Sequence, residues 1–435
     1  MVRFQHHVKV AAAVATGVAI AAMTTGCGLS DTSNQSQDQA VSGAITGSIK
    51  FQTWNLKAKF TPYFTDLVAA FEKQHPGAKV DWIDQPADNY ADKLTADAAA
   101  GTLPDVVNTS PDMAYPLYKK NVLLDLSKAD PKAADAFTPE SWASGVMPGS
   151  TGNFALPWYL NTGPYFYNKK LFSDNGLDPA KPPTTYDELQ QQALTLADKS
   201  KGTIAMLGQT PQVEDLALYG SKIMNDDQSA FIFNDAKGVA LVDMYKKMYD
   251  AKALLPEALS DSYTGSGKKF MSQQVAFTSG SAYDLQNFKT QAPSLYPNVA
   301  ITKALTNTGH NNMYVQSLSV PASSQNKATA VAFAEFVTNA ANQLAFAKIV
   351  NIFPSTKDSL DDPFFTAQDG TDNTKVRVAA ASQLRGAINY TPVKMSDPMK
   401  KVIQREIANA MLGKKTAQQA LDEAVRQCDQ LLANS

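Results

Sequence analysis

This 435-residue sequence is poor in the residues from which crosslinks and metal centres are built. It has two cysteines, Cys27 and Cys428, and four histidines. One cysteine pair cannot form the disulfide framework that supports many small secreted domains. Beyond the N-terminal segment only His75 and His310 remain, and neither has a neighbouring Cys, Asp or Glu at metal-ligand spacing. We therefore expect no metal centre and no cofactor.

Neither sign of charge is in excess. The chain has 39 Lys and Arg against 41 Asp and Glu, which gives a formal net charge of -2 and an isoelectric point of about 6.1. Nucleic-acid binding depends on clustered positive charge. We expect no nucleic-acid partner.

Long apolar runs are absent except near the N-terminus, where basic residues precede the apolar residues 10–23. This stretch is shorter than the roughly 20 residues that span a bilayer, and it is typical of an export signal. A small residue, Gly26, then precedes Cys27. This arrangement resembles the lipobox of bacterial lipoproteins, in which the cysteine is acylated. We expect residues 1–26 to be a lipoprotein signal peptide and Cys27 to be the lipidated residue.

Two features qualify this prediction. Thr24 stands where the lipobox usually has leucine, and an ordinary secretory signal cut near Ala19 or Ala21 is the alternative. The polar residues after Cys27 cannot bury an apolar face, so we expect residues 27–47 to form a flexible tether.

The chain is longer than one ordinary hydrophobic core needs, so two lobes are expected. Strand patterns at residues 47–54, 78–83 and 103–107 alternate with helical patterns that contain Phe64 to Phe71 and Tyr90 to Ala98. This order is typical of an α/β sheet with parallel strands. Ligands of such sheets bind beyond the carboxyl ends of the strands. Those ends carry Trp54, Asn55, Asp84, Gln85, Ser110 and Asp112.

Residues 156–170 concentrate five aromatic residues beside Pro, Gly and Asn: Trp158, Tyr159, Tyr165, Phe166 and Tyr167. Sugars stack their C–H faces on such rings and hydrogen-bond to nearby polar groups. The alternative is a buried strand, because aromatic residues are also favoured in sheets. Paired carboxylates such as Asp84 and Asp112 leave glycoside cleavage open, but hydrolysis needs one acid of raised pKa at a set separation. We expect binding and no enzymatic activity.

Several motifs occur in an order that resembles the extracellular solute-binding proteins of ABC importers, family 1. They include the export signal and the segments at residues 71–77, 103–106, 156–159, 167–169 and 183–189. The resemblance implies a two-lobed, periplasmic-binding-protein-like α/β fold of type II, with a ligand cleft between lobes joined by crossover segments. It places residues 48–160 and 320–355 in the first lobe, and residues 161–319 and 356–435 in the second.

The resemblance also implies the ligand contacts, with Trp158 as the strongest single candidate. The family often continues the Gly280–Ser281 turn into tryptophan, whereas Ala282 follows here, so Tyr283, Tyr165 or Tyr167 could supply the second ring. The expected ligand-binding residues are Trp54, Asn55, Asp84, Gln85, Asp112, Trp158, Tyr159, Asn161, Gly280, Ser281 and Tyr283.

The function implied by the resemblance is that of a lipid-anchored, extracytoplasmic and monomeric receptor. It would bind a mono- or oligosaccharide by stacking and hydrogen bonds and deliver it to membrane permease subunits. The mixture of rings, amides and two carboxylates favours a neutral polyol. The alternatives are a polyamine, thiamine, metal or phosphonate bound by the same fold, a carbohydrate-active surface enzyme, and a scaffold lipoprotein without ligand.

Overall fold

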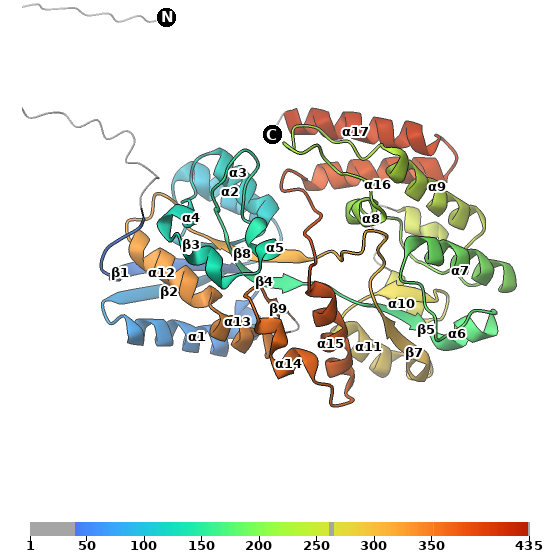
Figure 1. The fold of residues 1–435 in the computed structure, drawn as a ribbon, viewed down its shortest axis with the longest axis horizontal. Coiled ribbons are helices and arrows are strands. Elements are labelled where there is room, and N and C mark those ends of the chain that lie inside the picture. The colour runs from blue at the N-terminus through green and yellow to red at the C-terminus, as the bar shows by residue number, and fades with distance from the viewer. Residues whose placement is uncertain (1–39, 261–264, 351, 434–435) are drawn as a thin grey trace, which may run out of the picture. The chain divides into compact units, whose positions relative to one another are not determined.

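The computed structural model describes residues 40–260, 265–350 and 352–433. The expected signal peptide and Cys27 lie outside these residues. Among the described helices, none has both the length and the apolar character that a bilayer crossing requires. The described residues form two lobes, each built around its own sheet and core (Figure 1).

The first lobe contains a mixed six-stranded sheet. Its strands are β1 (Gly47–Trp54), β2 (Ala78–Gln85), β3 (Val106–Thr109), β4 (Leu156–Asn161), β8 (Tyr314–Ser319) and β9 (Phe353–Pro354), in the order β2-β1-β3-β8-β4-β9. β1 is parallel to β2 and β3, as the alternation of strands and helices predicted, while β8 is antiparallel to β3 and β4. Because β8 belongs to this sheet, we propose that the first lobe begins its second segment before Tyr314 and not at residue 320.

Helices cover both faces of the first sheet. They are α1 (Lys57–Gln74), α2 (Tyr90–Ala100), α3 (Pro111–Lys119), α4 (Leu126–Ala129), α5 (Pro139–Ala143), α12 (Lys327–Thr338), α13 (Ala340–Ala347) and α14 (Pro363–Thr366). One face packs on α1, α12 and α13 in the main core of the lobe. The other face packs on α2 through Tyr90 and Leu94, which contact Val107. The carboxyl ends of β1 and β3 therefore lie between two helical layers.

Two helical stretches are interrupted. α1 is kinked at Phe60, two residues before Pro62. The helical stretch from Lys327 to Ala347 is split into α12 and α13 at Asn339. Asn339 has extended backbone and accepts from the Asn342 amide, because an asparagine side chain is a better N-cap than helix interior.

The second lobe has a three-stranded antiparallel sheet. Its strands are β5 (Tyr165–Asn168), β6 (Phe277–Ser279) and β7 (Val299–Thr302), in the order β6-β5-β7. Side chains of a strand alternate between faces. Accordingly, Tyr167 packs in the main core of this lobe, whereas Phe166 packs in a second cluster with Phe288.

The helices of the second lobe lie on both faces of this sheet. They are α6 (Lys169–Asp174), α7 (Tyr186–Lys199), α8 (Val213–Tyr219), α9 (Ala236–Asp250), α10 (Ser266–Met271), α11 (Ala282–Gln291), α16 (Asp397–Met411) and α17 (Ala417–Ala433). A capping box formed by Thr185 and Glu188 begins α7. Cys428 is fully buried in α17, where it packs in the main core of the lobe as a small apolar residue. Its burial raises the pKa of the thiol to about 12.

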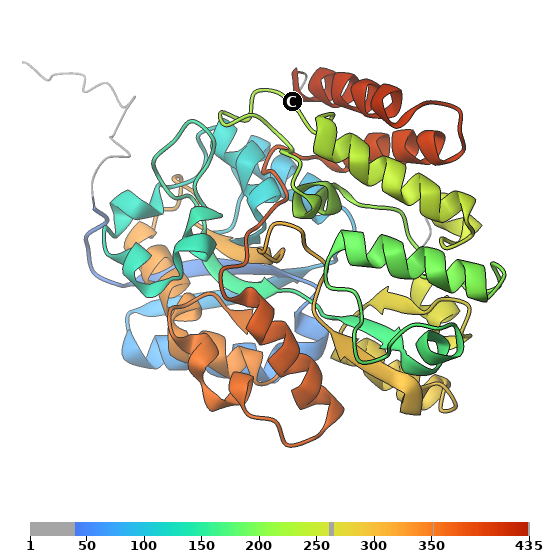
Figure 2. The ribbon, with the colours of Figure 1, turned by 45° about the vertical axis from the view of Figure 1, so that its right-hand side comes forward.

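One helix, α15 (Asp372–Leu384), packs against both lobes. Its Val376 lies in the Phe166 cluster of the second lobe, while Ala380 and Leu384 lie in the main core of the first. Figures 1 and 2 show α15 beneath the strands that cross between the lobes. α15 therefore contributes side chains to the cores of both lobes.

Candidate functional site

The predicted strand ends meet at one edge of the first-lobe sheet. β1 and β2 pair in register, so that Trp54 lies opposite Gln85, and Asn55 donates its backbone N–H to the Gln85 carbonyl at 2.8 Å. Asn55 is exposed, with φ of 56°, a left-handed conformation that asparagine tolerates better than most residues. Asp112 lies in the first turn of α3, directly after β3. Trp54, Asn55, Gln85 and Asp112 thus lie at the same edge of the first-lobe sheet, as the order of strands and helices predicted.

Trp54 is held in place by two contacts. Its ring stacks on Tyr90, with centroids 5.3 Å apart and planes inclined by 22°. Its Nε1 donates to Oε1 of Gln316 at 3.3 Å, and the same oxygen accepts from Nδ2 of Asn108 at 3.0 Å. Oδ1 of Asn108 is buried without a partner among the described residues. Trp54 is half-buried, so part of its ring borders this polar group.

The oxygens of Asp84 are largely engaged within the protein. Oδ1 accepts from the Thr53 hydroxyl at 2.6 Å and from the Leu56 amide at 3.2 Å, and Oδ2 accepts from the Lys57 amide at 3.0 Å. These amides belong to the first turn of α1, whose N–H groups have no partner within the helix. Asp84 thus caps α1 from a neighbouring strand. Asp112 is less engaged, since its described bond comes from the Ser110 hydroxyl.

The structure corrects the placement of Trp158. We expected its ring to border an open cleft, but the side chain is 0% exposed and lies in the main core of the first lobe. It stacks on Phe346 and makes edge contacts with Phe51 and Phe64. The reason is strand alternation, which directs Trp158 into the same core as Leu156 and Leu160 across an irregular pairing between Pro157 and Tyr159. The alternative of a buried strand describes this residue correctly.

Tyr159 and Asn161 flank that core at the end of β4. Tyr159 is half-buried, its ring meets Trp158 edge-on, and burial raises the pKa of its hydroxyl. Asn161 is exposed. In the pairing of β4 with β8, Tyr159 lies opposite Gln316 and Asn161 lies opposite Tyr314. The end of β4 is therefore continuous with the polar group around Trp54.

Tyr314 is a residue that our sequence argument did not select as a ligand contact. Its side chain is 51% exposed, among the most exposed of the large apolar side chains described. It belongs to the sheet of the first lobe, yet nearby protein and the charges of Glu214 and Asp215 in the second lobe raise the pKa of its hydroxyl. Tyr314 therefore combines an accessible ring with a position near acidic residues of the second lobe. Tyr314 and Gln316 are two positions apart on β8, so their side chains lie on the same face of the strand. This spacing was the signal that could have identified Tyr314.

In the second lobe, the predicted Gly280–Ser281 turn is closely packed. A side chain at Gly280 would meet the Phe166 ring at 2.8 Å, and one at Gly163 in the crossover would meet the Gly280 carbonyl at 2.6 Å. The amide and hydroxyl of Ser281 both donate to Asp284, each at 2.7 Å, in the capping box of α11. Tyr283 lies in the first turn of that helix. The glycines are thus required for packing where the chain crosses between lobes.

A small polar cavity of about 210 Å³ lies in the second lobe beside the start of α8. Three glutamine amides dominate its lining of Gln209, Thr210, Gln212, Ala258, Leu259, Ser260 and Gln404. Gln212 accepts from Nε2 of Gln404 at 2.5 Å, and its backbone N–H donates to Asp215 at 2.6 Å. Asp215 also accepts from the Tyr186 hydroxyl, and burial raises its pKa to about 6. These contacts hold the amides in place.

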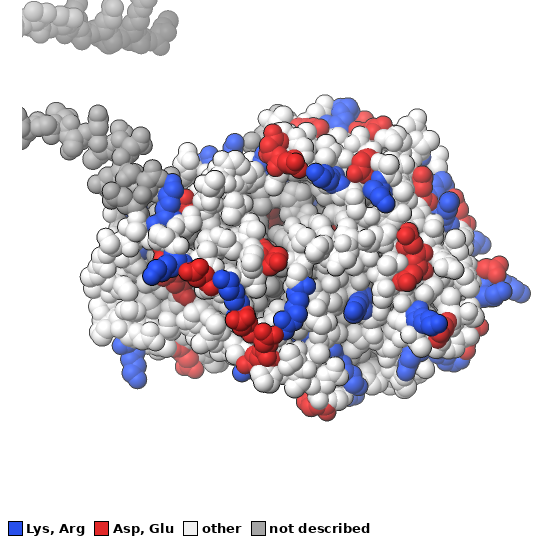
Figure 3. All heavy atoms as spheres, viewed as in Figure 1, with Lys and Arg blue, Asp and Glu red and all other residues white. Residues whose placement is uncertain are grey.

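A larger cavity of about 580 Å³ lies between the lobes. The first lobe contributes Glu140, Ala143, Ser144 and Val146, from α5 and the residues after it, and the second contributes Ala217, residues 221–226 and Gln228. The remaining lining is the segment 388–393, which connects α15 to α16. None of the predicted contacts lines the cavity. Figure 3 shows the surface hollowed between the two halves of the molecule. In the described residues, no cluster of three or more His, Cys, Asp or Glu could hold a metal ion.

Comparison with known proteins agrees with this architecture. The family described as bacterial extracellular solute-binding protein matches residues 57–344. The galactooligosaccharide-binding protein of Bacillus subtilis (strain 168) is 27% identical over 318 residues, which cover 68% of this chain and 71% of that protein. The sn-glycerol-3-phosphate-binding periplasmic protein UgpB of Escherichia coli (strain K12) is 24% identical over 420 residues, covering 84% of this chain and 88% of UgpB.

A solved structure extends the likeness to the whole body. A candidate oligosaccharide periplasmic-binding protein from Synechococcus sp. MITs9220 is 27% identical, with a TM-score of 0.79, and the superposition covers 89% of this chain and 99% of that one. This agreement confirms the two-lobed α/β fold. Since the family match spans well over half of the chain, the protein is a member of the bacterial extracellular solute-binding proteins.

Proposed function

We propose that this protein is the extracytoplasmic substrate-binding subunit of an ABC importer, and that it binds an uncharged saccharide between its lobes. Family membership supports the receptor role. The saccharide is supported by relatives named for a galactooligosaccharide and for an oligosaccharide. Closure of two lobes around the solute is the hinge motion that such folds perform.

The observation that carries the proposal is the chemistry of the strand-end group. We define this group as Trp54, Asn55, Gln85, Asp112, Asn161, Tyr314 and Gln316. It combines two accessible aromatic rings with four amides and one carboxylate. Rings suit the C–H faces of a sugar, amides both donate hydrogen bonds to sugar hydroxyl groups and accept them, and a carboxylate accepts them. Tyr314 takes the place that we had assigned to Trp158.

The space between the lobes is consistent with a small solute. The cavity of about 580 Å³ falls within the roughly 300–1,000 Å³ that is usual for small-molecule sites. It is walled by both lobes, as closure around a solute requires. None of the strand-end group lines this cavity, and the amide and hydroxyl groups of Asn225, Asn389, Ser144 and Thr391 form a second set of polar contacts on the surface between the lobes.

The similarity to UgpB raises a phosphorylated polyol as the second candidate. Phosphate groups are usually held by Arg or Lys in charge-assisted hydrogen bonds. The strand-end group contains neither, and its charged member, Asp112, is negative. A neutral saccharide therefore fits this group better than a phosphate ester does.

Titration calorimetry on the body without its tether tests the proposal. The panel would contain galactooligosaccharides, maltooligosaccharides, N-acetylated chitooligosaccharides and their monosaccharides, together with sn-glycerol 3-phosphate and spermidine. We expect saturable binding of at least one neutral saccharide and none of the charged solutes. Binding of glycerol phosphate or spermidine alone would reject the neutral-sugar assignment while keeping the receptor role.

We also propose that the receptor is a monomer without catalytic activity and that Cys27 carries a lipid anchor. The proposal of an anchor rests on the lipobox resemblance. Acylation attaches a chain to the membrane surface, so Cys27→Ser should release the protein into the soluble fraction. Retention of that variant in the membrane fraction would reject the anchor. Light scattering tests the monomer, and intact recovery of a bound, labelled glycan tests the absence of turnover.

A further inference from the structure

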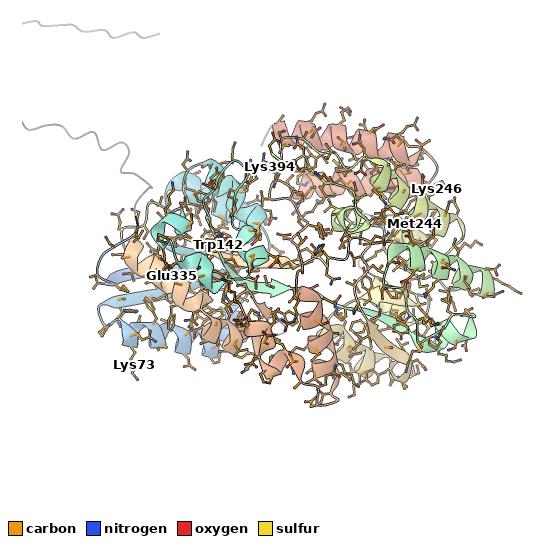
Figure 4. The ribbon with its side chains drawn as sticks, in the orientation of Figure 1. Lys73, Trp142, Met244, Lys246, Glu335 and Lys394 are labelled. Atoms are coloured by element: carbon orange, nitrogen blue, oxygen red, sulfur yellow. The ribbon has the colours of Figure 1, made fainter. Side chains whose placement is uncertain are left out.

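One lysine on the segment that joins α15 to α16 contacts both lobes. Lys394 lies between α15 and α16, and its Nζ donates to the backbone carbonyl of Gln228 at 2.6 Å. The same Nζ lies 5.7 Å from the centroid of the Tyr115 ring. Figure 4 shows Lys394 at the boundary between the two halves of the molecule.

The partners of Lys394 belong to different lobes. Met395, the next residue, lies in the main core of the second lobe, and Gln228 lies in a loop bracketed by Met224 and Phe231 of the same core. Tyr115 lies on α3 and packs on a cluster of the first lobe. The ammonium group therefore bridges a carbonyl of one lobe and an aromatic face of the other.

The bridge reaches the helix that follows the strand-end group. α3 follows β3 directly, and its first turn carries Asp112 of that group. Lys394 lies on the segment that leads from Ala387, in the main core of the first lobe, to Met395, in the main core of the second. The contact with Tyr115 exists only while α3 and this segment lie together, so it favours the closed arrangement.

The chemical environment of Lys394 suits a bridge that forms on closure. Burial lowers its pKa, as does the nearby Lys119 on α3, whereas Asp227 acts in the opposite direction. Its two contacts are a carbonyl oxygen and an aromatic face, both of which attract a cation more strongly when water is excluded. Separation of the lobes would return the ammonium to water and remove the ring contact.

We propose that Lys394 is a positioning residue that stabilises the closed lobes by linking Gln228 to Tyr115. The proposal rests on the proposed function, because closure matters only if a solute is enclosed. It assigns no contact with the solute to Lys394. Removing the bridge should weaken solute binding about 3- to 10-fold, the range expected for loss of one partly desolvated cation–π contact.

Lobe separation can be measured without any solute, so failure of this proposal is distinguishable from failure of the proposed function. Spin labels at Lys73→Cys in α1 and Lys247→Cys in α9, in a Cys27→Ser background, report the distance between the lobes. We expect Lys394→Met to shift the distance distribution toward longer values, and Lys394→Arg, which keeps a cation, to restore it. An unchanged distribution and unchanged solute affinity in Lys394→Met would overturn the proposal.

Two further variants guard against a folding artefact. Tyr115→Leu removes the ring from the opposite side of the bridge and should reproduce the Lys394→Met shift, whereas Tyr115→Phe keeps the ring and should not. As a matched control, Lys237→Met removes a similar contact, 5.9 Å from the Tyr219 ring, that lies wholly within the second lobe. A shift in that control as large as in Lys394→Met would contradict a specific role for Lys394.

Discussion

The indole ring of Trp158 stacks on the phenyl ring of Phe346, with centroids 5.7 Å apart and planes inclined by 15°. Phe51 and Phe64 close the edges of the same pair. Trp158, the largest aromatic residue of the segment 156–170, therefore belongs to the core of the first lobe and not to the candidate site. This placement also changes what a substitution at Trp158 should do.

We predict that Trp158→Ala destabilises the fold by about 3–5 kcal/mol, because it leaves a large cavity in a packed core. Trp158→Phe should lose much less stability, because an aromatic ring still fills part of the site and the substitution removes a buried Nε1 that has no described partner. Urea unfolding measures both. Equal stability of Trp158→Ala and the native protein would show that the ring does not support the core.

Tyr314→Ala should act on binding instead. A half-exposed side chain supports little core, so the change in unfolding free energy should stay within about 0.5 kcal/mol. If Tyr314 is the stacking ring, solute affinity should fall about 10- to 30-fold, as for a central aromatic contact. Calorimetry with Tyr314→Phe, which keeps the ring, should show a small loss. Leu412→Ala, an equally exposed apolar residue on the second lobe, is the control and should bind normally.

Asp84→Ala should reduce stability by about 1–2 kcal/mol, because it removes the acceptor for two amides at the start of α1. Asp84→Asn retains one acceptor oxygen and should lose less. Thermal unfolding distinguishes the two variants. Identical melting temperatures for Asp84→Ala and the native protein would argue against a capping role.

Glu335 on α12, labelled in Figure 4, should make stability depend on pH. Burial, the negative charge of Asp130 and a hydrogen bond with Asp130 raise the pKa of its carboxyl from 4.5 to about 7. The folded state therefore holds this proton more tightly than the unfolded state, and stability falls as pH rises from about 4.5 to 7. Glu335→Gln should flatten this part of the profile and raise the melting temperature at pH 8.

The matched control for this experiment is Asp198→Asn, which removes a largely exposed carboxylate. Its pH profile should follow that of the native protein, because exposed charges contribute little. If Glu335→Gln retained the full pH dependence between pH 4.5 and 7, another group would be responsible for it.

Local sequence patterns predicted much of the first lobe. The strands predicted over residues 47–54 and 78–83 and the helical stripe of Tyr90 and Leu94 rest on short-range rules of periodicity. The structure contains each of them, with the second strand extended to Gln85. The place of β8 in the first sheet was not predictable in this way, because its pairing with β3 joins residues about 200 positions apart. No local pattern records such a partner.

In the candidate site, too, some features follow from local sequence patterns and others depend on the tertiary structure. Strand polarity and helix spacing were enough to bring Asn55, Gln85 and Asp112 to one edge, since parallel strands end together. Which aromatic ring faces the solvent was decided only by the tertiary structure. Trp158 is buried because its face of β4 is covered by Phe346 and the rest of the first-lobe core, while Tyr314, at the start of β8, remains accessible. Exposure depends on which distant segments pack over a side chain, and that is a property of the assembled fold.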